Sequence, residues 1–218
     1  MKKISYLVVL LFVANVVFTS CGNDNDNDNP IDNNPPGIGN PTATTDPGVM
    51  INGIRWATRN VDMPGTFAQT PEATGRFYQW GTLNGETHHW APTGTITDWN
   101  NNSTNRIAWT AANNPCPLGW RVPTASELRS LYTGIWTIRN GINGRLFGAY
   151  PYQIFLPAAG HRSSGVLQNV NSWGYYWSNE GNTTGRNPTA RSLRFSNSIA
   201  NTHYESRALG RSVRCVAE

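Results

Sequence analysis

The chain begins with its longest apolar run and then loses apolar residues almost completely. Residues 4–18 are apolar apart from Ser5 and Asn15, and Lys2 and Lys3 stand ahead of them. A positive start followed by a run of this length is typical of an export signal, and the run is short for a stable membrane span. The pattern therefore predicts an exported protein.

The residues that end this run resemble the lipobox of bacterial lipoproteins. Small residues precede Cys21 in the segment Thr19-Ser20-Cys21-Gly22, although Phe18 and Thr19 depart from the usual leucine and from the usual alanine or serine. The resemblance implies that residues 1–20 are a signal peptide. It also implies that Cys21 carries acyl chains such as palmitate, which would hold the protein on a membrane. The alternative is an ordinary secretory signal beside a chance cysteine.

A polar segment separates this signal from the rest of the chain. Residues 21–48 are rich in Asn, Asp, Pro, Gly and Thr, so they bury too little apolar surface to offset the entropy of ordering. We expect a disordered tether. Asn and Asp alternate over 23–29, and a similar acidic stretch directs Bacteroidetes-type lipoproteins to the cell surface. By that resemblance we expect an outer-membrane lipoprotein exposed at the cell surface; a plain spacer is the alternative.

Short apolar segments between Gly- and Asn-rich stretches fill residues 49–218, which is enough chain for one domain with its own core. Their composition predicts short strands. These lie at 49–61, with Asn52-Gly53 as a hairpin turn, and at 154–159, 174–178, 190–195 and 212–216. Residues 85–114 look like a long irregular loop that carries several tryptophans.

One segment, residues 123–132, has the pattern of a helix. Thr124 can cap its start, and Glu127 completes a capping box because it stands three residues later. Leu128 and Leu131 then share one face. Strands together with this helix predict an α+β domain.

The charged residues of the domain are unusual. Residues 49–218 carry 15 arginines, no lysine and 8 acidic residues, and the chain has nine tryptophans. The arginines are scattered, and arginine forks to carbonyl groups and stacks on rings. We therefore expect Arg–aromatic stacking and no nucleic-acid partner; a site for a polyanion is the alternative.

Several motifs follow one another along residues 49–218. They are Trp56-Ala57-Thr58-Arg59-Asn60-Val61, residues 114–124 with Glu127 and Leu131, Leu156-Pro157-Ala158-Ala159-Gly160, Tyr175-Tyr176-Trp177-Ser178 and Ser212-Val213-Arg214-Cys215-Val216. In this order they resemble the Fibrobacter succinogenes major paralogous domain. The segment from Gly119 to Glu127 is similar to the core of formylglycine-generating enzymes. The resemblance implies a C-type-lectin-like domain of the α+β class, with short antiparallel strands, one or two helices and long irregular loops.

Two cysteines remain once Cys21 is assigned to the lipid. Cys116 and Cys215 are expected to form a disulfide, because leftover cysteines of an exported protein usually pair. The resemblance agrees, since C-type-lectin-like domains tie the helix region to the terminal strand. Two buried free thiols are the alternative.

The sequence offers no constellation for catalysis. His88, His89, His161 and His203 fit neither a nucleophile elbow nor a zinc motif, and the cap explains Glu127. The copper-binding cysteine pair of formylglycine-generating enzymes has no counterpart. We therefore expect no enzyme activity, no catalytic residue, no metal and no cofactor.

Ligand binding is the function that the sequence favours. Trp90, Trp99 and Asn100 lie in the long loop, where the implied fold places its ligand surface. Indole faces stack on sugar rings and amides bond hydroxyl groups. We expect a binding or adhesion module that recognises glycan or protein without a metal. The alternatives are an accessory envelope lipoprotein, in which tryptophans such as Trp109 only pack the loop, and an enzyme.

Overall fold

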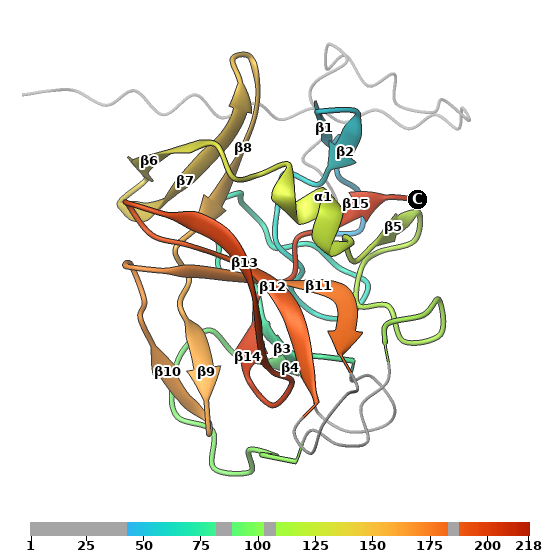
Figure 1. Cartoon of the computed structure of the whole chain (residues 1–218), viewed down its shortest axis with the longest axis vertical. Helices are drawn as coiled ribbons and strands as arrows, with labels where there is room; N and C mark the ends of the chain where they lie inside the picture. The colour runs from blue at the N-terminus through green and yellow to red at the C-terminus, as the bar shows by residue number, and fades with distance from the viewer. Residues whose placement is uncertain (1–42, 82–88, 103–107, 183–187) are drawn as a thin grey trace, which may run out of the picture. The chain divides into compact units, whose positions relative to one another are not determined.

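Figure 1 shows the computed structural model of the chain. It describes residues 43–81, 89–102, 108–182 and 188–218, with the side chains at 89 and 90 excepted. The expected signal, Cys21 and most of the tether lie outside the described residues. No helix among the described residues has both the length and the apolar character needed to cross a bilayer.

The expected α+β class is wrong. Strand accounts for 43% of the structure and helix for 3%, so the fold is β-rich and mainly antiparallel. The predicted helix exists only as α1 (Ala125–Arg129), where Thr124 and Glu127 form the expected capping box. Helix content stays low because the chain leaves α1 after five residues and enters two long strands.

Four sheets hold the strands of the described residues. The first has the order β1 (Val49–Ile51), β2 (Ile54–Trp56), β15 (Val216–Ala217) and β5 (Trp120–Arg121). The second has the order β10 (Val166–Gln168), β9 (His161–Ser163), β14 (Gly210–Arg211), β3 (Phe77–Gln79) and β4 (His89–Trp90). The third is β11 (Gly174–Asn182), β12 (Thr189–Phe195) and β13 (Ala200–Ser206), and the fourth is β6 (Gly134–Arg139), β7 (Ile142–Ala149) and β8 (Tyr152–Pro157).

Turn chemistry fixes two of the hairpins. Asn52 and Gly53 have φ of 51° and 79° and join β1 to β2, as the sequence predicts. Asn140 and Gly141 have φ of 49° and 79° and join β6 to β7 in the same way. Positive φ at both central residues twists a two-residue turn to match the flanking strands.

The C-terminal strands pair with strands from the N-terminal part of the domain. Val216 of β15 pairs with Trp56 of β2 on one side and with Arg121 of β5 on the other. In Figure 1 the red strand β15 accordingly lies between β2 and β5. Gly210 of β14 in turn pairs with Gln79 of β3. Residues from both ends therefore share two sheets.

Two clusters of buried side chains form the core. One surrounds the disulfide and includes Trp80, Trp120 and Trp177; the other lies under α1 and includes Leu128 and Leu131. Trp120 and both leucines are buried, and the two leucines lie in the same cluster, as their predicted shared face requires. The ordered contacts also begin before residue 49: Asp46, which the sequence reading places in the tether, is buried and pairs with Arg59 at 3.1 Å.

Candidate functional site

The tryptophans of the long loop have different surroundings. Trp109 is buried, with its ring centroid 5.8 Å from that of Trp80. It belongs to the core cluster around the disulfide. The side chain of Trp90 lies outside the described residues, although its backbone pairs with Phe77 in the β3–β4 ladder.

Trp99 is half-buried and is anchored at both its ring and its nitrogen. Its indole N–H donates to the carbonyl oxygen of Ala208 at 3.1 Å. Its ring lies over Gly210, where a Cβ atom would stand 2.6 Å from Cη2 of the indole. Glycine at 210 is therefore what allows the ring to approach β14, and the exposed remainder of Trp99 has a fixed position.

Asn100 lies beside Trp99 and is exposed. Its backbone oxygen accepts a hydrogen bond from Nε2 of Gln79 at 2.8 Å, and its side-chain oxygen accepts from the backbone N–H of Asn102 at 2.8 Å. The next residue, Asn101, is bonded through its side chain to Ser164 at 3.0 Å. The structure thus places Trp99 and Asn100 next to each other on a polar loop held to the scaffold.

A buried arginine holds this loop, which we call the Trp99 loop (residues 91–102). The guanidinium of Arg162, on β9, donates to the carbonyl oxygens of Ala91, Thr93 and Gly94 at 2.7 to 3.2 Å, and to that of Gly165 at 2.7 Å. Its side chain is fully buried, and burial lowers its pKa from the ordinary value. Every one of these acceptors is a neutral carbonyl, so Arg162 holds the backbone of the loop in place.

Stacked arginines are common in the described part of the chain, which confirms the prediction of Arg–aromatic stacking. Arg207 lies 4.2 Å above the ring of Trp80, and Arg211 lies between Tyr175 and Trp177 at 4.9 and 4.7 Å. Arg162 lies 5.7 Å above Phe77. Each of these cations has an aromatic partner inside the domain, so the contacts stabilise the fold.

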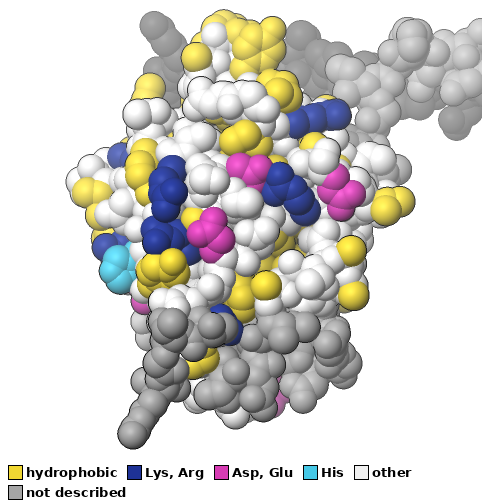
Figure 2. Space-filling model, turned by 45° about the vertical axis from the view of Figure 1, so that its right-hand side comes forward, with side chains coloured by type: hydrophobic (Ala, Val, Ile, Leu, Met, Phe, Trp, Pro, Cys, Tyr) yellow, Lys and Arg dark blue, Asp and Glu magenta, His cyan; other side chains and the backbone are white. Residues whose placement is uncertain are grey.

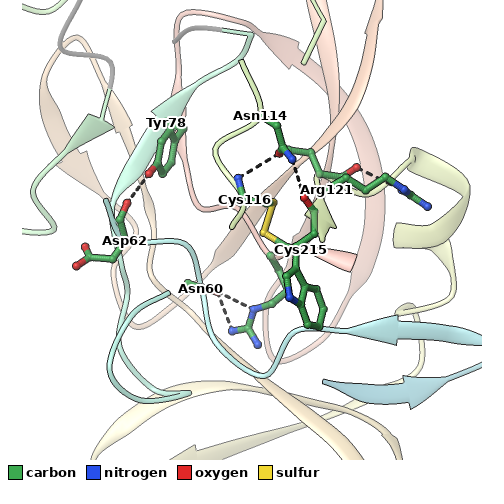
Figure 3. Close-up of a disulfide and its surroundings, with 10 residues drawn as sticks. Asn60, Asp62, Tyr78, Asn114, Cys116, Arg121 and Cys215 are labelled. Carbon is green, nitrogen blue, oxygen red and sulfur yellow. Dashed lines mark hydrogen bonds between the residues drawn. A yellow bond between two sulfur atoms is a disulfide. The ribbon is translucent and has the colours of Figure 1, made fainter. Parts of the chain in front are cut away.

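The disulfide Cys116–Cys215 is present, with its Cα atoms 6.1 Å apart, as predicted (Figure 3). Asn114 organises the segment next to it: its side-chain oxygen accepts from the N–H of Cys116 at 3.1 Å, and its amide donates to the oxygen of Trp120 at 2.6 Å. The bridge links residues 99 positions apart. It fixes the entry to α1 against the end of the chain.

A pocket of about 200 Å³ lies beside this entry and is lined by Trp109, Arg121 and Asn179 among others. The guanidinium of Arg121 in its lining is already paired, since it donates two hydrogen bonds of 2.9 and 2.6 Å to the carboxylate of Glu127. The Arg121 guanidinium holds the pKa of Glu127 below its usual value. The Arg121–Glu127 pair of this motif therefore stabilises the start of α1.

Two histidines have side chains that the structure describes, and neither contacts a nucleophilic side chain in the bonds below. His161 packs edge-on against Tyr175 at 4.7 Å, and burial, with a smaller contribution from Arg211, lowers the pKa of His161 to about 4. His203 contacts Glu205 at 3.3 Å. Among the described residues no three His, Cys, Asp or Glu side chains gather where they could hold a metal ion.

Comparison with known proteins found no match for this chain among family models, curated proteins or solved structures. The resemblance described above therefore stays a prediction. Sequence reasoning missed Arg162, which lies outside the motifs. A signal for it would have been a lone arginine on a short strand, and several other arginines of this chain share that property.

Proposed function

We propose that the chain is a cell-surface lipoprotein of the outer membrane whose domain binds a glycan at the Trp99 loop without a metal. In this proposal Cys21 carries the lipid, and the tether is the part of the polar segment that precedes the buried Asp46. The proposal also includes membership of the Fibrobacter succinogenes major paralogous family, which rests on the motifs alone.

One observation carries the glycan proposal: Arg162 fixes the backbone of a polar surface loop in which Trp99 and Asn100 are neighbours. A loop already held in one conformation loses less entropy when it binds a ligand. The exposed part of an indole can stack on a sugar, and neighbouring amides can bond its hydroxyl groups. Trp90 is the further ring expected at this surface.

A second candidate is an accessory envelope lipoprotein without a ligand. The burial of Trp109 and the hydrogen bond from Trp99 to Ala208 favour it, because both rings serve packing. An enzyme is the third candidate, and the described residues present no catalytic constellation that supports it.

The two leading candidates are separated by binding of the full chain, solubilised in detergent, to a panel of glycans and matrix proteins. We expect glycan binding that survives EDTA and weakens about tenfold in Trp99→Ala and in Asn100→Ala. Trp90→Ala tests the remaining expected ring. The control is Tyr150→Ala, which changes an exposed aromatic residue of another surface. Loss with EDTA overturns the mechanism, binding to proteins alone overturns the ligand class, and binding to nothing favours the accessory lipoprotein.

A further inference from the structure

A second groove lies away from the Trp99 loop, between the β1–β2 hairpin and the β7–β8 hairpin. Its volume is about 370 Å³, which falls in the range of small-ligand sites. β1 and β8 are each the last strand of a sheet, and they lie against each other across this groove. The lining residues are Met50, Ile51, Asn52, Ser130, Thr133, Gly148, Ala149 and Tyr152.

The walls of the groove are fixed by contacts within the domain. The side-chain amide of Asn52 donates to the carbonyl oxygen of Ser130 at 3.3 Å, which ties the β1–β2 turn to the end of α1. On the other wall, a Cβ atom at Gly148 would stand 3.0 Å from Cδ1 of Ile51, so the absence of a side chain lets β7 approach β1. The groove therefore exists before any ligand arrives.

The groove combines an aromatic face with unused polar groups. Tyr152 is 65% exposed. Among the described residues, no hydrogen bond uses the amide oxygen of Asn52 or the hydroxyl groups of Thr133 and Tyr152. These groups can accept from, and donate to, the hydroxyl groups of a sugar while the phenol ring stacks on its apolar face.

None of the lining residues is charged. A charged ligand would lose hydration in the groove and gain no counter-charge from its walls, which is unfavourable. The surface around it agrees: in Figure 2 hydrophobic side chains gather at the upper end of the domain, the end at which Figure 1 draws the tip of β7–β8.

We propose that this groove is a second binding site, that its ligand is a neutral oligosaccharide, and that Tyr152 stacks on a sugar ring while Asn52 and Thr133 bond its hydroxyl groups. The site is separate from the Trp99 loop, and it goes beyond the function proposed above. Either site can fail without the other.

The test measures binding of neutral glucan, mannan, galactan and xylan oligosaccharides to the full chain in detergent by titration calorimetry, with polygalacturonate fragments as charged probes. We expect at least one neutral probe to bind, and Tyr152→Ala to weaken it about tenfold or more. Tyr152→Phe keeps the ring and should stay within about threefold. Thr133→Val removes one hydroxyl group at nearly constant volume and should weaken binding about threefold to tenfold.

Tyr150→Ala is the matched control, because Tyr150 is 88% exposed on the same hairpin and does not line the groove. It should leave the affinity for the neutral probe unchanged. Melting temperatures of all variants check that they fold, and Thr133→Val keeps the test decisive if Tyr152→Ala does not. The proposal is overturned by binding of charged probes only, by no binding of neutral probes, or by equal effects of Tyr150→Ala and Tyr152→Ala. Loss in Trp99→Ala alone would assign the binding to the Trp99 loop.

Discussion

Two nitrogens of Arg214 donate to the side-chain oxygen of Asn60, from Nε at 2.9 Å and from Nη2 at 2.7 Å. The guanidinium is fully buried, and its other hydrogen bonds go to the carbonyl oxygens of Ala57 and Phe155. Burial lowers the pKa of Arg214 to about 10. The bond joins the first and the last of the sequence motifs, so these motifs have a structural role in holding the ends of the domain together.

Asn60→Ala should therefore lower the free energy of unfolding by about 2–4 kcal/mol, because it leaves a buried guanidinium without its side-chain acceptor. Urea denaturation measures the loss. Asn201→Ala is the matched control: Asn201 accepts from Arg194 at 3.0 Å, but both residues are only half-buried. Its loss should stay below about 1 kcal/mol. Equal losses in the two variants would contradict the structural role assigned to Asn60.

Arg162→Lys should release the Trp99 loop. Lysine keeps the charge but lacks the planar fork that reaches several carbonyl oxygens at once, so we expect a loss of about 2–4 kcal/mol in unfolding free energy. Limited proteolysis should then cut within residues 91–102 earlier than in the wild type. Arg139 is half-exposed and pairs with the buried Glu72 at 3.3 Å; Arg139→Lys keeps this charge and should change stability by less than about 1 kcal/mol. An unchanged cleavage pattern in Arg162→Lys would show that other contacts hold the loop.

Trp120→Ala should cost about 3–5 kcal/mol, because it removes a buried indole and leaves a cavity. The ring packs edge-on against Phe67 at 5.6 Å and lies under the guanidinium of Arg55 at 5.8 Å. Thermal unfolding measures the loss. Trp136→Ala, at a half-buried position of β6, should cost less, and the opposite ranking would argue against a core role for Trp120.

Acid should destabilise the domain through His161. Its pKa is about 4 in the folded chain and about 6.5 when the chain unfolds. Between these values the unfolded state takes up a proton that the folded state does not, so this contribution is complete above pH 6.5 and falls as the pH falls toward 4. After allowance for solvent screening of a half-buried group, we expect about 1–2 kcal/mol.

The measurement compares urea unfolding of the wild type and His161→Phe at pH 7 and pH 4.5. Carboxylates titrate in both proteins, so the difference between their two pH dependences isolates the imidazole. The wild type should lose more stability than the variant. Parallel curves would mean that His161 takes up its proton in the folded state as easily as in the unfolded chain.

Cys21→Ser should release the protein from the membrane, because it removes the residue expected to carry the lipid. Cell fractionation and palmitate labelling measure this. The wild type should fractionate with membranes and incorporate label, whereas the variant should be found free in the periplasm or the medium. Label that persists in Cys21→Ser would place the acylation elsewhere, and an unlabelled wild type would favour the ordinary secretory signal.

Local signals in the sequence predicted local structure well. The Asn52-Gly53 turn, the capping box of Thr124 and Glu127 and the bridge between Cys116 and Cys215 are all present. Each depends on residue types that act over a few positions, or on a pairing with one possible partner in the domain. The physical chemistry of these features is contained in the residues themselves.

The fold class could not be obtained in this way. Residues 134–149 carry the same turn signal at Asn140-Gly141, yet the glycines at 134, 144 and 148 hide the alternation expected of strands. They are needed for close packing, since a Cβ atom at Gly144 would stand 2.5 Å from the ring of Phe155. The role of Arg162 was equally hidden, because three of its four acceptors are backbone carbonyls about 70 positions away.

The pairing of β15 with β2 and β5 also sets the order of events during synthesis. A ribosome delivers β2 and β5 long before Val216, and until that residue emerges the sheet has a gap between them. A nascent chain that ends before β14 would also leave one edge of β3 unpaired, with β4 on its other edge. These two sheets therefore stay incomplete during synthesis, and the domain can finish folding only after its last strands leave the ribosome.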